Sequence, residues 1–353
     1  PFYYMFMRLW TSVFGYSEIA LRMPSIIFSL ITIYIVYLIV KKLKPAMALW
    51  ASALVAFNPL LIYYAQEARM YAMAVMFITL AIYAKMRNKK RELYLWSFLA
   101  FCTYYGSIFI LIPLEFWNWG VVGAGVVLLP LLLKQFATSH SLLGEVVNWN
   151  LTLGTVNLKN ILLIFIKMVT GRVPFEKIYI LPTLLFWLTA IKSGLKNKFF
   201  LRLLLVPLIL VLIFSFKVPM LQYFRVQYLI IPLSILIALK FKNSILFLII
   251  LWIFSGMYLL NNKNYREDWK KMSRDLPNEV YMIGSFESPI NYYRRDIKVK
   301  DIKQIKPSEE KFVYIPYGEI IHGLDHNKIF GEIGYKKIEE KSYREISFET
   351  WSL

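Results

Sequence analysis

The sequence predicts a polytopic all-α membrane protein that carries a small α/β domain at its carboxyl end. Of its 353 residues, 58% are hydrophobic and only 18% are charged, whereas soluble domains average about 25% charged residues. The mean hydropathy is +0.52, which excludes a disordered tail and a disulfide scaffold. From about residue 262 the hydrophobicity drops and Pro, Asp and Glu become frequent, so a domain of another class begins there.

The charges are divided unevenly between these two parts. Residues 1–260 contain 24 Lys and Arg but only 6 Glu and no Asp, whereas residues 261–353 contain 17 basic and 16 acidic residues. The excess of positive charge lies in short loops between apolar runs, which is typical of membrane topology. We therefore expect no nucleic-acid partner. Cys102 is the only cysteine, so the chain forms no intrachain disulfide.

The apolar runs predict ten membrane-spanning helices, several of them shorter than the usual span of about 20 residues. A transmembrane domain over residues 1–260 would contain them all. The expected spans are 23–40, 46–64, 70–86, 93–104, 106–118, 120–134, 178–192, 200–217, 228–240 and 244–260.

Basic residues in the short loops give the expected orientation. One set of alternate loops contains 14 Lys and Arg, while the opposite short loops contain only Arg69, Lys217 and Arg225. Because basic loops stay in the cytoplasm, we expect a multi-pass cell-membrane protein. Its outward segments would be residues 1–22, 64–69, 135–177, 217–227 and everything after 261.

Two outward segments resemble helices that lie on the membrane surface, namely residues 1–14 and about 158–170. Between them, Trp149 is either an interfacial anchor or a sugar-stacking residue, and residues 150–152 match a glycosylation acceptor pattern. In the small extracytoplasmic domain, residues 261–353, we expect strands at 279–284 and 311–316 and a helical turn at 288–294.

The most informative stretch is the outward turn between the second and third spans. It follows Asn58-Pro59 and places three phenols, an amide, a carboxylate and a guanidinium within ten residues: Tyr63, Tyr64, Gln66, Glu67, Arg69 and Tyr71. Arg binds phosphate in a bidentate manner, and a carboxylate can act as a base or hold a metal. The structural alternative is a helix-capping ion pair flanked by interfacial tyrosines.

Other candidates lie on the same expected face. Arg225, in the stretch 222–228, is either a second phosphate contact or a side chain that reaches the lipid headgroups. Tyr104 and Tyr105 occupy an outward turn and could line the same cavity. Glu18 and Arg22 have the i,i+4 spacing of a helical salt bridge, for which we expect a structural role.

The remaining charged groups suggest less. Glu92 fits the cytoplasmic surface, and Glu115 lies at the expected inner end of a span. His322 and His326 are spaced like helical metal ligands, but Gly323 between them favours a solvated loop. The sequence identifies no definite cofactor, although a divalent metal is compatible with the site.

With these segments in place, the chain resembles the polyprenyl-phosphate-sugar-dependent membrane glycosyltransferases of the GT-C superfamily. Within this superfamily, the chain is most similar to the branch that includes the protein O-mannosyltransferases, the lipid A aminoarabinose transferase and the bacterial core-sugar transferases. Four stretches support the resemblance, of which the second is the specific one. They are residues 1–25, residues 58–72 with the sequence Tyr63-Tyr64-Ala65-Gln66-Glu67-Ala68-Arg69-Met70-Tyr71, residues 223–232, and Tyr265-Arg266-Glu267-Asp268-Trp269.

The resemblance implies a mechanism and a set of partners. An inverting transferase would move a monosaccharide from a polyprenyl-phosphate donor to a lipid, glycan or protein acceptor at the outer face of the membrane. Arg69 and Arg225 would bind the phosphate, and Tyr63, Tyr64, Gln66, Tyr71 and Tyr105 would line the substrate site. Glu67 would be the second acidic position of the catalytic site. The principal catalytic acid of the family precedes the segment that matches Pro1, so we expect it upstream of this chain.

Two other classes of function fit the same features. A transporter or flippase of polyprenyl-linked glycans would also need outward cations and an aromatic groove. Such proteins often contain internal repeats and charged or broken helices at the membrane midplane. This sequence shows no repeat, and the charged residues of its candidate site lie at the outward turns. A noncatalytic transferase-like fragment is the third alternative.

Overall fold

The computed structural model describes residues 1–145, 148, 153–240, 245–305 and 310–353. It divides the chain into two compact units. The first contains residues 1–136 and 153–260, and the second contains residues 137–152 and 261–353.

The first unit is a bundle of helices. Their bounds are α1 Phe2–Phe14, α2 Glu18–Leu43, η1 Pro45–Met47, α3 Ala48–Ala56, α4 Pro59–Ala65, α5 Tyr71–Met86, α6 Lys90–Thr103, η2 Tyr105–Ser107, α7 Ile108–Leu114, α8 Trp119–Glu145 (whose last residues belong to the second unit), α10 Leu158–Thr170, η3 Lys177–Tyr179, α11 Ile180–Gly194, α12 Lys198–Ser215, η4 Tyr223–Leu229, α13 Ile230–Lys240 and α14 Ile245–Leu260. Each of the ten expected spans therefore coincides with a helix or a helix pair.

Four of the described helical segments are long and apolar enough to cross a membrane: Glu18–Leu43, Trp119–Thr138, Lys198–Ser215 and Tyr223–Lys240. A fifth span is added if Pro45–Ala56 and Pro59–Ala65, which are bent by 63° at Asn58, count together. The helices α5 and α14 are apolar but have only 16 residues each. Ten complete spans therefore remain a prediction.

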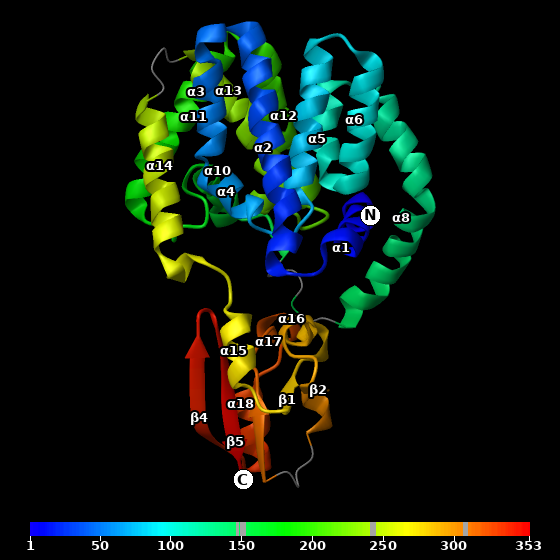
Figure 1. Cartoon of the computed structure of the whole chain (residues 1–353), viewed down its shortest axis with the longest axis vertical. Helices are drawn as coiled ribbons and strands as arrows, with labels where there is room; N and C mark the ends of the chain where they lie inside the picture. Colours follow the sequence, from blue (N-terminus) through cyan, green and yellow to red (C-terminus); the bar gives the residue numbers. More distant parts are fainter. Residues whose placement is uncertain (146–147, 149–152, 241–244, 306–309) are drawn as a thin grey trace. The chain divides into compact units, whose positions relative to one another are not determined.

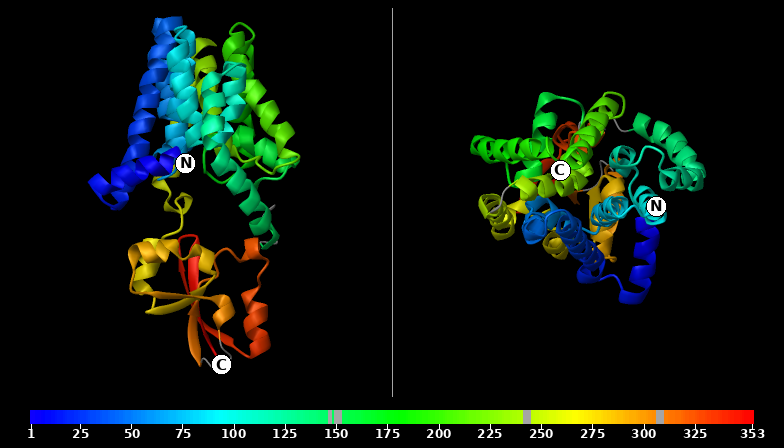
Figure 2. Two further views of the ribbon diagram at one scale, coloured as in Figure 1. Left: turned by 90° about the vertical axis from the view of Figure 1, so that its right-hand side faces the viewer. Right: turned by 90° about the horizontal axis from the view of Figure 1, so that it is seen from above.

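The helices alternate in direction, which brings the loops of each set to one end of the first unit (Figure 1). The connections α2–α3, α5–α6 and α11–α12 carry the basic residues and lie together at the upper end. The helices α1, α4 and α10 lie at the opposite end (Figures 1 and 2). Both α1 and α10 confirm the helices expected at residues 1–14 and 158–170.

The second unit is a five-stranded sheet with helices on both faces (Figure 2). Its strand order is β2-β1-β3-β5-β4; β1 is parallel to β2 and β3, and β5 is antiparallel to β3 and β4. The elements are η5 Asn262–Asn264, α15 Trp269–Asp275, β1 Glu279–Met282, η6 Gly284–Phe286, α16 Ser288–Tyr293, β2 Lys298–Asp301, η7 Ile302–Gln304, β3 Lys311–Tyr314, α17 Glu319–His322, α18 His326–Ile333, β4 Lys336–Tyr343 and β5 Ile346–Ser352.

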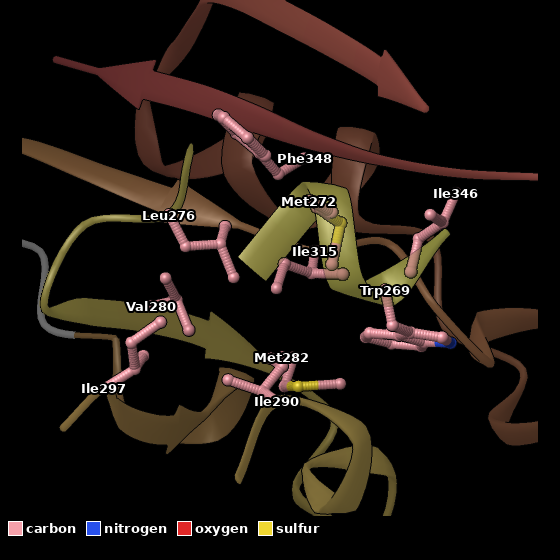
Figure 3. Close-up of a cluster of buried hydrophobic side chains, with 10 residues drawn as sticks. All are labelled: Trp269, Met272, Leu276, Val280, Met282, Ile290, Ile297, Ile315, Ile346 and Phe348. Atoms are coloured by element: carbon pink, nitrogen blue, oxygen red, sulfur yellow. The ribbon is translucent and has the colours of Figure 1, made fainter. Parts of the chain in front are cut away.

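Alternation along the strands gives this sheet a core on each face. Val280 and Met282 of β1 pack with Trp269 and Met272 of α15 (Figure 3). Tyr281 of β1 points to the other face and packs in the cluster that contains Phe330 of α18 and Trp351 of β5. The expected strands at 279–284 and 311–316 and the helical turn at 288–294 are therefore confirmed, whereas the sequence analysis missed the β4–β5 hairpin.

Candidate functional site

The turn between α4 and α5 is fixed by hydrogen bonds to two other helices. The Asn58 side chain caps α4 by accepting from the N–H groups of Leu60 and Leu61, and it donates to the Met168 carbonyl of α10 at 2.8 Å. The Ser25 hydroxyl of α2 donates to the Glu67 carbonyl at 2.6 Å. The backbone that carries Glu67 is thus positioned by α2 and α10.

Four aromatic rings from separate segments meet beside this turn. Tyr71 at the start of α5 is the centre of the group, because its ring lies 5.1 Å from that of Tyr64, 5.6 Å from that of Tyr104 and 5.8 Å from that of Phe224. Tyr64 and Phe224 are also neighbours, with ring centroids 6.3 Å apart. We call Tyr64, Tyr71, Tyr104 and Phe224 the aromatic cluster.

Two arginines lie against rings of the aromatic cluster. The guanidinium of Arg69 lies 5.2 Å from the centre of the Tyr71 ring, and that of Arg225 lies 5.9 Å from the centre of the Phe224 ring. Because the Tyr71 and Phe224 rings are in contact, the structure joins two arginines that are 156 positions apart in the sequence.

Arg225 is also held by the backbone. The guanidinium of Arg225 donates to the Pro219 carbonyl at 3.2 Å. The backbone carbonyl of Arg225 accepts a hydrogen bond from the Tyr104 hydroxyl at 3.0 Å. Both Arg69 and Arg225 are half-buried, as is Glu67. The site therefore offers two positioned cations and a carboxylate that solvent or a ligand can reach.

A third arginine, which the sequence analysis missed, lies on the neighbouring tyrosine. Arg172 follows the end of α10 and donates to the Tyr63 hydroxyl at 2.8 Å, with its guanidinium 4.9 Å from the ring centre. Gly171 allows this approach: its φ is +63°, and an added Cβ would lie 2.8 Å from Cβ of Pro59. Burial and the charge of Arg172 lower the pKa of Lys167 to about 8.

Tyr3 brings α1 to the same site. Its ring is buried, and burial raises the pKa of its hydroxyl; the charges of Tyr4 and Glu67 add to this effect and that of Arg69 opposes it. The helix α1 thus places a phenol near the carboxylate and the arginine of the turn.

An apolar cavity of about 150 Å³ reaches the aromatic cluster between α2, α3, α4 and α5. Ile26, Leu30 and Val75 are among its lining residues, and Tyr64 and Gln227 also border it. The Gln227 side chain is only 1% exposed, and neither its amide nitrogen nor its oxygen has a hydrogen-bond partner within the described structure. Buried amides are normally paired, so this one points to a polar group of a ligand or to water.

The other predicted residues are placed as follows. Tyr63 is buried and contacts Tyr64, with ring centroids 4.9 Å apart. Gln66 is half-buried at the end of α4. Tyr105 packs against Phe101, and its hydroxyl donates to Gln135 of α8 at 3.3 Å, so Tyr104 rather than Tyr105 joins the aromatic cluster.

The structural role expected for Glu18 and Arg22 is confirmed by an i,i+4 ion pair at 3.7 Å. Residues 149–152, with Trp149 and the glycosylation pattern, lie outside the described residues. Among the described residues, no group of three or more His, Cys, Asp or Glu could hold a metal ion. The solvated loop expected for His326 is wrong, because the side chain is buried at the start of α18.

The chain was compared with protein families, curated proteins and solved structures. Residues 1–117 match the family model described as dolichyl-phosphate-mannose-protein mannosyltransferase. No curated protein and no solved structure matches the chain. The matched region contains Tyr3, the turn with Glu67 and Arg69, and three of the four residues of the aromatic cluster. The match covers about a third of the chain, and over these residues it supports the resemblance to membrane glycosyltransferases of the GT-C type.

Proposed function

We propose that this protein transfers a monosaccharide, with inversion, from a polyprenyl-phosphate donor to a lipid, glycan or protein acceptor at the outer face of the membrane. The observation that carries the proposal is the pair of arginines on the contacting rings of Tyr71 and Phe224, beside Glu67. The helix α4, which leads into the turn with Arg69, lies at the end of the first unit opposite its basic loops (Figure 1), which supports an outward site.

In this proposal the site stabilises the leaving phosphate. The acceptor oxygen attacks the anomeric carbon while the bond from that carbon to the phosphate oxygen breaks, so negative charge grows on the phosphate. Arg69 and Arg225 neutralise this charge, and their ring contacts and the backbone bonds of Arg225 hold them in position beforehand. Glu67, as the second acidic position, orients the acceptor hydroxyl, whose proton passes to the principal catalytic carboxylate that the family resemblance implies.

The donor class is supported by the cavity that reaches Tyr64. A polyprenyl phosphate combines an apolar chain with an anionic head. The apolar cavity is bordered by Tyr64, whose ring contacts the Tyr71 and Phe224 rings that carry the arginines. Gln227 would hydrogen-bond a polar atom near the junction of chain and phosphate, which would satisfy its buried amide.

We expect Glu67→Gln and Arg225→Ala to lower transfer at least tenfold, about 1.4 kcal/mol of barrier. The measurement follows the loss of label from radiolabelled polyprenyl-phosphate sugars in membranes that contain the full-length protein at equal levels. Arg8→Ala, which removes an exposed arginine of α1, is the matched control and should retain wild-type activity.

The assay also separates the alternatives. Turnover at the wild-type rate in both variants would contradict the assignment of the site. If no donor is turned over while polyprenyl phosphate still binds, the protein is a flippase or a noncatalytic transferase-like protein.

We further expect Arg172→Met to lower kcat/KM for the donor about five- to tenfold, close to 1 kcal/mol of transition-state stabilisation. The charge lies against Tyr63, next to the aromatic cluster. Arg172→Lys should retain most of the activity because it keeps the charge. Lys177→Met, which removes an exposed cation five residues further on, should have no effect.

A further inference from the structure

A second cavity lies at the opposite end of the first unit, where the basic loops gather. It has a volume of about 340 Å³ and is formed by the end of α5, the end of α7 with the residues after it, and the start of α12. Its charged lining residues are Lys85, Glu115 and Arg202, and its apolar ones include Pro113, Phe116 and Val206. The proposed transfer reaction does not use this cavity.

The charges of the lining leave one cation available. Lys85 and Glu115 form an ion pair, so their charges offset each other and hold the Lys85 side chain in place. Arg202 is exposed, and its guanidinium lies 5.9 Å from the centre of the Phe199 ring. A neighbouring cavity of about 60 Å³ shares Lys85 and Glu115 and adds Lys89 and Lys90. The rim is therefore positive overall.

The apolar lining distinguishes this cavity from a site for a soluble anion. Phe116 is 76% exposed and Ile112 is 37% exposed, and both line the cavity next to the cations. Free phosphate would leave these apolar side chains exposed, so its binding would gain no free energy from the burial of apolar surface. A ligand with a phosphate and two acyl chains would cover both kinds of surface, since basic pockets between membrane helices bind anionic headgroups.

We propose that this cavity binds the headgroup of an anionic diacyl phospholipid from the leaflet at the basic end of the first unit. Arg202 pairs with the lipid phosphate, while an acyl chain lies along Phe116 and Val206. The ion pair between Lys85 and Glu115 keeps the rim ordered and the second cation close. This lipid site is separate from the site at Arg69 and Arg225, and it does not depend on the proposed transfer.

Native mass spectrometry of the full-length protein in detergent tests the proposal, with phosphatidylglycerol and phosphatidylcholine as competing probes. We expect preferential retention of phosphatidylglycerol, and a loss of about fivefold in its binding in Arg202→Gln. Phe116→Ala, which leaves the charge unchanged, should also weaken retention. Lys196→Gln is the matched control, because this exposed lysine lies outside the cavity lining and should bind as the wild type does.

Three results would overturn the lipid site. The first is equal phosphatidylglycerol binding by Arg202→Gln and wild type. The second is a loss in Arg202→Gln without any loss in Phe116→Ala, which would reveal attraction to a charged surface without a built pocket. The third is displacement of the lipid by inorganic phosphate at equal concentration, which would identify a free-phosphate site.

Discussion

Replacing His326 with alanine is expected to destabilise the second unit by about 3–5 kcal/mol, the usual cost of breaking a buried ion pair by removing one partner. Nδ1 of His326 lies 2.8 Å from a carboxylate oxygen of Glu319, and Nε2 lies 2.8 Å from one of Glu349. His326 and Glu349 are each 5% exposed. Without the imidazole, the buried carboxylate of Glu349 and the half-buried carboxylate of Glu319 would each have one partner fewer.

The geometry also determines the protonation state of this histidine. An ionised carboxylate only accepts hydrogen bonds, so both ring nitrogens must carry hydrogen, as in the imidazolium. Burial lowers the pKa of His326, but the hydrogen bonds and charges of Glu319 and Glu349 outweigh it and raise the pKa above its usual value. Tyr314 donates to Glu319 at 2.5 Å, and Trp351 and Lys337 donate to Glu349 at 2.9 and 3.2 Å.

The pH dependence follows from this shift. Because the folded pKa is raised, the stabilisation is complete below the pKa of an unfolded histidine, about 6.5, and it is lost as the pH rises through the folded value. Hydrogen exchange of the full-length protein, corrected for the intrinsic rate at each pH, measures this stabilisation as the protection of peptides from α17, α18 and β5. We expect wild-type protection to fall as the pH rises above the unfolded value and through the raised folded pKa.

The variants provide the comparison. His326→Ala should have low protection that is independent of pH over this range. His322→Ala is the matched control, because that half-buried ring contacts Phe286 edge-on at 5.9 Å and faces no carboxylate in the described contacts. If both variants lost the same protection, or if wild-type protection rose with pH, the ion pairs of His326 with Glu319 and Glu349 would not stabilise the second unit.

Much of the first unit was predictable because its signal is local. Long apolar runs interrupted by basic loops located the helices, and the amphipathic pattern located α10 before any contact was known. One expected span, residues 46–64, is instead divided into the shorter helices α3 and α4 because of contacts with other helices. The chain bends by 63° at Asn58, where capping by its side chain starts a new helix and directs the turn with Glu67 toward α2.

The candidate site was predictable only in part, because the contacts that complete it are distant in sequence. Arg172 and its partner Tyr63 are 109 residues apart, and no local pattern marks Arg172. Tyr104 and Tyr105 are adjacent, and the extended backbone of Tyr104 at the end of α6 decides which ring reaches Tyr71. The strand β4 was missed because its side chains are almost all exposed, so it has no hydrophobic alternation.

Gly120→Ala is expected to destabilise the first unit by about 3 kcal/mol, at the upper end of what overpacking costs. The start of α8 lies directly on the backbone of α6, as small residues allow in membrane helix pairs. A Cβ at Gly120 would lie 1.9 Å from the Tyr94 carbonyl oxygen and 2.7 Å from the carbonyl carbon. These are backbone atoms of a helix, so no side-chain rotation relieves the clash.

Hydrogen bonds prevent α8 from simply moving away. The Asn118 side chain donates to the Ser97 hydroxyl of α6 at 2.8 Å and accepts from the Gly120 N–H at 3.1 Å. Separating the helices by the distance that a methyl group requires would break the buried bond between Asn118 and Ser97, which adds the cost of an unpaired buried amide. The two penalties therefore arise together.

Thermal unfolding in detergent provides the measurement, with Gly125→Ala as the matched control. Gly125 lies on the same helix, and an added Cβ there meets no heavy atom within 4 Å. Alanine should then raise the unfolding temperature slightly, because it favours a helix over glycine by about 1 kcal/mol. Gly120→Ala should lower it by several degrees. Equal unfolding temperatures for the two variants would mean that α6 and α8 do not make this contact in the membrane protein.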